Sequence, residues 1–224
     1  MHSHRPLRQL QRRIGNFGLL TLAIFTMMMV RPFLAENGEA SYIMDVLFAS
    51  VFLSGIYAAR RNHTTFLIAF LLAAINVAGR IHLHLSYARI AGELMNVSVI
   101  LFFLHAIYNI GSYIWSERHR VNHDVIFAAI SAYLLLGIAW AHVFDLLEMF
   151  APGSFKGLDA ALIKDDFLYY SFVTLCTLGF GDIVPLSRPA RAMTIVEAVT
   201  GQLYIAVLIA RLMGSYIDEI RRKD

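Results

Sequence analysis

The chain has 224 residues, of which 58% are hydrophobic and only 16% are charged, and its formal net charge is +3. Soluble globular chains are about 45–50% apolar and about 25% charged, because their surfaces must meet water. The composition therefore excludes a soluble enzyme and indicates a membrane protein. Basic residues stand between apolar runs instead of in one patch, so we expect no nucleic-acid binding. The single cysteine excludes an intrachain disulfide framework.

Six apolar segments have about the length that a membrane-spanning helix needs, which is roughly 20 residues. The first four are separated by short polar joints, and a longer stretch separates the last two. We expect spans at residues 15–35, 41–59, 64–85, 91–115, 124–150 and 189–217. Lys and Arg are denser on the side of the N-terminus, which predicts that both termini are cytoplasmic. We expect no cleaved signal peptide, since Phe33-Leu34-Ala35 lacks the small-x-small cleavage pattern.

The fourth span lacks the pattern of a voltage-sensing helix, which carries Arg or Lys at about every third position. Between Arg89 and Arg118 the only basic side chain is the weakly basic His105. We therefore expect no conventional voltage sensor. Charges do occur at similar depths near the outer ends of the first four spans. We expect them to form ion pairs, with ligand or proton sensing as the alternative: Arg31, Asp45, Arg80 and Glu93.

The stretch between the last two spans holds an apolar segment that is too short to cross a membrane. It runs from Asp166 to Cys176 and continues into Thr177-Leu178-Gly179-Phe180-Gly181-Asp182. Such a segment enters the bilayer and turns back, which is tolerated only where protein or water surrounds the backbone. Asp165 and Asp166 stand where its helix should begin, and carboxylates there complement the free amides and the helix dipole. The sequence predicts a re-entrant helix followed by a loop.

The residue types of this loop suit the removal of water from a potassium ion. Rings of backbone carbonyls from four symmetry-related chains can replace the hydration shell. Pointing successive carbonyls at one axis requires positive φ at alternate residues, which Gly179 and Gly181 permit. The expected K+ ligands are the carbonyl oxygens of Thr177, Leu178, Gly179 and Phe180, with the Thr177 hydroxyl at the inner end.

The hexamer from Thr177 to Asp182 resembles the tetrameric pore-loop potassium-channel family, whose selectivity filter reads T-x-G-Y/F-G-D. The resemblance implies an all-α membrane protein with six transmembrane helices and a re-entrant pore helix and filter loop between the fifth and sixth. It also implies a homotetramer, with three further copies of the chain and membrane lipids as partners, in the plasma membrane. K+ is then the permeant ion, and we expect no organic cofactor and no enzymatic activity.

The domain organisation follows from this resemblance. We expect a cytoplasmic basic N-terminus at residues 1–14, a four-helix membrane domain at 15–120, a pore domain at 121–217 and a cytoplasmic tail at 218–224. The short tail predicts that no cytoplasmic regulatory domain is present.

The family pattern also assigns support of the filter, at residues Tyr169, Tyr170, Val173, Thr174 and Asp182. Tyr169 stands where an aromatic donor braces the filter aspartate, here Asp182. Tyr170 stands where a side chain usually bonds the filter tyrosine hydroxyl, which Phe180 lacks. Val173 replaces a glutamate that some members pair with the aspartate. Both departures predict a less rigid filter.

The last span carries the candidate gate. Gly201 stands at the family's hinge position, and close packing is the alternative reason for a glycine there. Ile205, Ile209 and Leu212 share one helix face, which either lines the pore and closes it or faces lipid.

Three further side chains near the loop and the last span stand out by their chemistry. We expect Arg211 to reach the membrane interface, with lipid-headgroup gating as the alternative. Glu197 lies mid-span and needs a partner that the sequence does not reveal. Cys176 is expected to be a buried packing thiol, with a redox sensor as the alternative.

Two functions compete with a potassium-selective channel. One is a non-selective cation channel of the same architecture, which the intact hexamer disfavours. The other is a subunit of a potassium transporter, but such transporters usually carry several pore-like segments in one chain and this chain has one.

Overall fold

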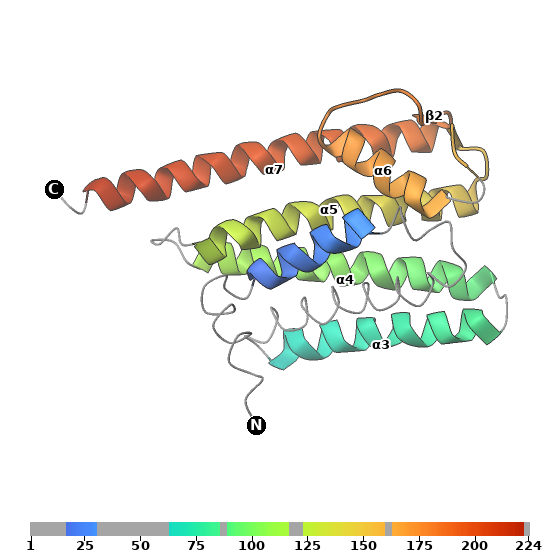
Figure 1. Ribbon diagram of the computed structural model, residues 1–224, viewed down its shortest axis with the longest axis horizontal. Coiled ribbons are helices and arrows are strands. Elements are labelled where there is room, and N and C mark those ends of the chain that lie inside the picture. The colour runs from blue at the N-terminus through green and yellow to red at the C-terminus, as the bar shows by residue number, and fades with distance from the viewer. Residues whose placement is uncertain (1–16, 31–62, 86–88, 117–122, 160–162, 222–224) are drawn as a thin grey trace. The chain divides into compact units, whose positions relative to one another are not determined.

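The computed structural model describes residues 17–30, 63–85, 89–116, 123–159 and 163–221 (Figure 1). Its elements are a helix Phe17–Val30, α3 His63–Leu85, α4 Arg89–Ser116, α5 His123–Phe150, β1 Phe155–Lys156, α6 Ile163–Leu175, β2 Val184–Pro185 and α7 Arg188–Arg221. The described chain is thus helical apart from one two-stranded pairing and its loops.

Four of the expected spans are helices whose ends fall within a few residues of the expected ones: α3, α4, α5 and α7. Of the first expected span, residues 17–30 are described and are helical. The second, at 41–59, lies outside the described residues. Three described helices are long and apolar enough to cross a membrane, at Asn96–Trp115, His123–Phe150 and Arg188–Gly214. Phe17–Val30 and His63–Asn76 are shorter apolar helices.

α6 is the short helix that the sequence places between the last two spans. With 13 residues and a rise of about 1.5 Å per residue it is roughly 20 Å long. A bilayer core of about 30 Å is therefore beyond its reach.

The chain forms two compact units, each built from separate stretches. The first unit comprises the described parts of residues 1–67, 106–134 and 209–224. Here the helix Phe17–Val30 packs on the first half of α5, where Thr21 Oγ1 lies 2.8 Å from Ser131 Oγ. Asp124, in the first turn of α5, accepts the Phe17 amide at 3.1 Å and the Tyr113 hydroxyl at 3.3 Å. One carboxylate thus connects three helices.

The second unit comprises the described parts of residues 68–105 and 135–208, and it holds α6 and the loop that follows. An aromatic cluster joins α5, β1 and α6, with Phe144 and Tyr170 centroids 5.1 Å apart and Phe155 and Phe167 also 5.1 Å apart. A Cβ on Gly137 would lie 2.7 Å from the Phe172 ring, so this glycine lets α5 and α6 approach closely.

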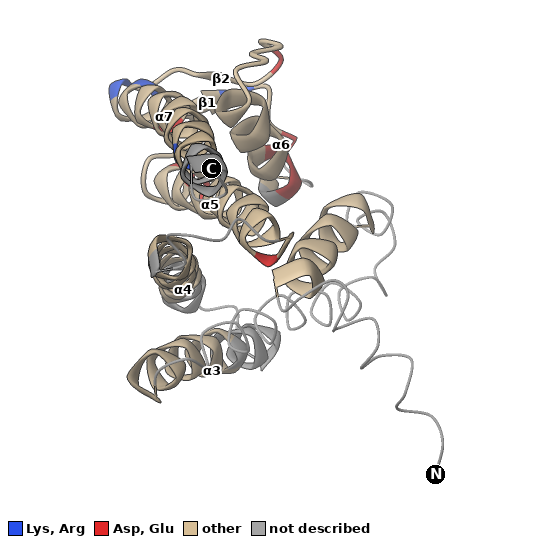
Figure 2. Cartoon of the chain, turned by 90° about the vertical axis from the view of Figure 1, so that its left-hand side faces the viewer, with Lys and Arg blue, Asp and Glu red and all other residues tan. Residues whose placement is uncertain are grey.

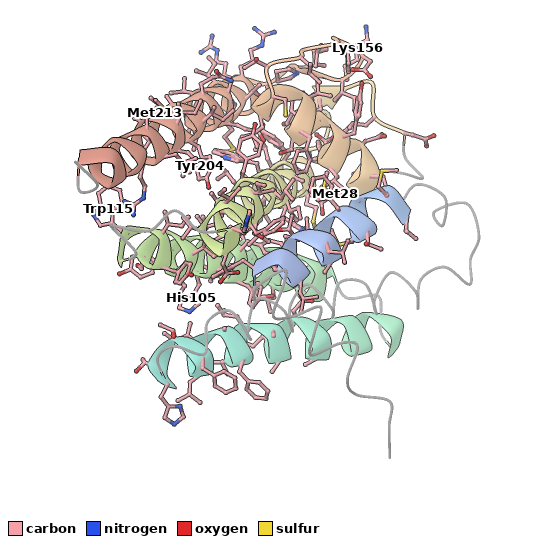
Figure 3. All side chains as sticks on the ribbon, turned by 60° about the vertical axis from the view of Figure 1, so that its left-hand side comes forward. Met28, His105, Trp115, Lys156, Tyr204 and Met213 are labelled. Carbon is pink, nitrogen blue, oxygen red and sulfur yellow. The ribbon has the colours of Figure 1, made fainter. Side chains whose placement is uncertain are left out.

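A short antiparallel strand pair in the same unit connects the chain before α6 to the chain after the loop that follows α6. β1 and β2 pair antiparallel, with Phe155 opposite Pro185 and Lys156 opposite Val184. Lys156 is labelled in Figure 3 and is exposed. The carbonyl of Asp182 occupies the space where a Gly157 Cβ would stand, and Gly157 has φ +93°. This strand pair therefore fixes the position at which the loop after α6 ends.

Candidate functional site

The first turn of α6 contains Asp165 and Asp166, and Figure 2 shows acidic residues of this helix in red. Asp166 Oδ2 accepts the backbone amide of Asp159, in the preceding loop, at 2.6 Å. From the sequence we expect Asp166 to serve the amides of its own helix, whereas this bond fixes the chain where it enters the helix. Burial is the main cause that raises the pKa of Asp166, and the nearby carboxylates add to it.

The loop after α6 is tied by its amides to the last turn of that helix. The Thr177 amide donates to the Thr174 carbonyl at 2.9 Å, and the Leu178 amide donates to the Val173 carbonyl at 2.8 Å. The Gly179 amide also reaches the Val173 carbonyl, at 3.4 Å. The C-terminal carbonyls of α6, which no helical amide can satisfy, thereby anchor the loop.

Backbone conformation alternates along this loop. Gly179 has φ +58° and Gly181 has φ +81°, as expected for the two glycines, and Thr177 also has a positive φ, +58°. The positive φ of Thr177 has no signal in the sequence, since a β-branched residue seldom takes this conformation. Positive φ at every second residue is the pattern that lets successive carbonyls point to one side.

The loop is exposed within its own chain. Leu178 and Phe180 are 58% and 66% exposed, and a Cβ on Gly179 or Gly181 would meet nothing within 4 Å. Cys176 is exposed as well, so its expected role as a buried packing thiol is not seen within one chain. Because these apolar side chains are exposed, another protein surface could cover the loop.

Asp182, directly after the loop, is held by α6. The Tyr169 hydroxyl donates to its Oδ2 at 2.6 Å, and the Ile183 amide donates to its Oδ1 at 3.0 Å. The Tyr169 ring also stacks on Phe180, with centroids 6.4 Å apart and planes at 13°. The hydrogen bond from Tyr169 is the main cause that lowers the pKa of Asp182.

Tyr170 points elsewhere, although it is the next residue. It is buried, and its hydroxyl lies 2.7 Å from Thr194 Oγ1 on α7. Because the Thr194 hydroxyl donates to the Ala190 carbonyl at 2.8 Å, Tyr170 is the donor of the pair. Tyr170, whose expected partner hydroxyl is missing on Phe180, therefore connects α6 to α7. Val173 is buried and Thr174 is half-buried.

The candidate gate residues lie on an unbroken α7. A Cβ on Gly201 would lie 2.7 Å from the carbonyl oxygen of Leu175, at the end of α6. This contact supports the packing explanation for the glycine, and the hinge stays a prediction. Ile205 is 37% exposed, Ile209 56%, and Leu212 is half-buried. That face is open within one chain, as either a lumen-facing or a lipid-facing role requires.

The remaining charged residues differ in what they contact and in whether the structure describes them. Arg211 donates to the Ile114 carbonyl and lies over the Trp115 ring, 4.9 Å from its centroid, at the end of α4 (Figure 3). It thus has a protein partner instead of only the interface that snorkelling predicts. Among the four charges expected to pair, Arg31 and Asp45 lie outside the described residues. Arg80 and Glu93 lie on α3 and α4, and their side chains are outside the described part.

A polar cluster lies between α4 and α5. The Asn96 amide nitrogen donates to Asp145 Oδ2 at 2.9 Å, and His142 Nδ1 lies 3.1 Å from Asn96 Oδ1. Nothing in the sequence pairs His142 with Asn96. In the described part of the chain, no group of acidic, histidine and cysteine side chains is arranged to hold a metal ion.

Comparison with known proteins bears on the same region. Residues 129–217 match a family model described as ion channel. Protein LctB of Bacillus caldotenax is 28% identical over 108 residues, which cover 44% of this chain and 80% of LctB. Two-pore potassium channel 4 of Arabidopsis thaliana is 38% identical over 69 residues, covering 31% of this chain and 24% of that protein.

A longer match includes part of the chain before the pore region. The voltage-gated potassium channel Kch of Escherichia coli (strain K12) is 29% identical over 142 residues, covering 54% of this chain and 32% of Kch. The matched residues therefore span less than a third of the length of both Two-pore potassium channel 4 and Kch. No solved structure matches it.

Proposed function

We propose that the chain is a member of the pore-loop potassium-channel family, which the match of residues 129–217 and the potassium-channel relatives support, and that it conducts K+ selectively and passively across the membrane. The observation that carries this proposal is the alternation of positive φ at Thr177, Gly179 and Gly181. In this conformation the carbonyls of residues 177–180 form a ladder of oxygens that replaces the hydration shell of K+. No bond is made or broken, and the ion moves down its electrochemical gradient.

One chain supplies one strand of such a ladder, so the proposal includes four copies around an axis. The exposure of Leu178 and Phe180 supports this assembly. We place the protein in the plasma membrane with both termini cytoplasmic, and α6 as a re-entrant pore helix entering from the outside.

The test is the reversal potential of the purified protein in planar bilayers, with K+ on one side and Na+ on the other. We expect unitary current steps that reverse near the K+ equilibrium potential. A reversal near zero would assign the protein to the non-selective cation channels. Flux without unitary steps would favour the transporter alternative.

A matched pair of variants tests the loop itself. Gly179 and Gly153 both have positive φ, +58° and +83°, and a Cβ at either would meet nothing within 4 Å. Alanine is therefore strained to a similar degree at both positions. We expect Gly179→Ala to abolish selective current and Gly153→Ala, outside the loop, to retain it. Normal conduction by Gly179→Ala would show that the filter is assigned wrongly.

A further inference from the structure

A carboxyl group of α7 is buried against the pore helix. Glu197 and Ser171 are both fully buried. Ser171 Oγ lies 2.5 Å from Glu197 Oε1 and 2.7 Å from the carbonyl oxygen of Gly137. Polar atoms of α7, α6 and α5 therefore form one continuous chain of contacts in the second unit.

Counting protons along this chain assigns the donors. A serine hydroxyl carries one proton, and the Gly137 carbonyl can only accept, so Ser171 donates to Gly137. The short contact between Ser171 Oγ and Glu197 Oε1 then needs a proton from Glu197. If Glu197 were ionised and accepted the Ser171 proton, two oxygens would face each other at 2.7 Å with no proton between them.

The surroundings also disfavour a charged Glu197. Its second oxygen, Oε2, is buried and has no hydrogen-bond partner among the described residues. An ionised carboxylate with an unsatisfied oxygen costs far more to bury than a neutral acid. Burial and geometry thus point to the same protonation state.

Among the described ionisable groups of α4, α5 and α6, none supplies a compensating cation to Glu197. The Tyr170 hydroxyl of α6 bonds to Thr194. His142 and Asp145 of α5 are both bonded to Asn96 of α4. Among these described groups, none is a positive partner bonded to Glu197.

We propose that Glu197 holds a proton at neutral pH and acts as a positioning residue, donating to Ser171 and thereby fixing the pore helix between α5 and α7. Ser171 stands two residues before Val173, whose carbonyl anchors the amides of Leu178 and Gly179. A displacement of Ser171 is therefore transmitted to the loop within one helical turn. The effect on conduction rests on the proposed function, whereas the protonation state does not.

Infrared spectroscopy of the full-length protein in lipid tests the proton directly. The spectrum should contain the carbonyl stretch of a neutral carboxylic acid at neutral pH. Glu197→Gln should remove that band. The control Glu148→Gln, which removes an acid on α5 outside this chain of contacts, should leave the band in place. If the difference between wild type and Glu197→Gln contains only carboxylate bands, Glu197 is ionised and the proposal is overturned.

K+ flux from liposomes tests the positioning role. Glu197→Gln keeps a donor for Ser171 and should keep the wild-type flux at neutral pH. Glu197→Leu removes the donor to Ser171 Oγ and leaves Ser171 bonded only to the Gly137 carbonyl, so flux should fall about tenfold or more. A glutamine variant as defective as the leucine variant would overturn the neutral-donor role.

A pH titration links the two measurements. As the pH is raised from about 6 to about 10, wild-type flux should fall over the same range in which the acid band disappears, and should persist if the band persists. Glu197→Gln should show no such fall. Flux and band that change independently would overturn the coupling. A protein that shows the band without selective K+ flux would refute the proposed function and leave the proton on Glu197 standing.

Discussion

The hydrogen bond from the Tyr169 hydroxyl to the Asp182 carboxylate joins α6 to the end of the loop that follows it. This bond holds the pKa of Asp182 below its ordinary value of 3.8. A carboxylate with a lowered pKa in the folded state contributes stability above its ordinary pKa, and the contribution is lost as the pH falls through the lowered value. The outer end of the loop is thus expected to stay fixed until the outside becomes strongly acidic.

Removing the hydroxyl in Tyr169→Phe should let Asp182 take up a proton at a higher external pH. Potassium current should therefore decline at a less acidic external pH than in the wild type, as measured by titrating current between about pH 7 and about pH 3. Tyr108→Phe is the control, because Tyr108 is 70% exposed on α4. Superimposable titrations of Tyr169→Phe and the wild type would show that the bond does not govern the mouth.

At the scale of single residues, the sequence predicts what depends on local chemistry. Gly179 and Gly181 were identifiable because only glycine takes positive φ readily. The positive φ of Thr177 was not identifiable, since it depends on the hydrogen bonds that the loop's backbone amides donate to the end of α6. The partners of Tyr170 and Glu197 were also unpredictable, because each depends on which face of one helix meets another.

At the scale of helices, length and hydropathy were enough to locate α3, α4, α5 and α7 to within a few residues. Contacts between helices were not predictable in the same way. Gly137 carries no sequence signal of its own, yet a side chain there would collide with Phe172. Arg211 was expected at the interface because nothing in the sequence indicates its contact with the end of α4.

The two explanations for Gly201 make opposite predictions for Gly201→Ala. A packing role predicts a collision with the Leu175 carbonyl and a loss of about 1–3 kcal/mol of stability. A hinge role alone predicts a helix that is more stable, by up to about 1 kcal/mol, and a channel that opens less. We expect the first result, measured as thermal or denaturant unfolding in detergent.

Gly214→Ala provides the control within the same helix. A Cβ at Gly214 would meet nothing within 4 Å, so alanine should be neutral or stabilising there. Equal destabilisation by both variants would mean that α7 resists any added side chain, and the contact with Leu175 would lose its special role.

At the scale of the whole molecule, the first prediction concerns voltage. Each elementary charge that crosses 100 mV contributes about 2.3 kcal/mol to gating, and no Lys or Arg lies between Arg89 and Arg118. We expect a shallow dependence of open probability on voltage, which changes when Rb+ replaces K+ because only ions in the filter sense the field. A steep dependence unaffected by the permeant ion would require gating charges elsewhere in the chain.

The last prediction concerns the number of chains. Non-helical backbone within a membrane must be covered by protein or water, and the loop after α6 is uncovered in one chain, with Phe180 66% exposed. Carbonyl rings around an axis need four copies, so native mass spectrometry in detergent should report a mass near four times 25.2 kDa. Phe180→Asp places four charges around that axis and should weaken the assembly, while Leu101→Asp, on an exposed position of α4, should leave the count at four. A monomer that conducts K+ selectively would exclude the four-chain filter.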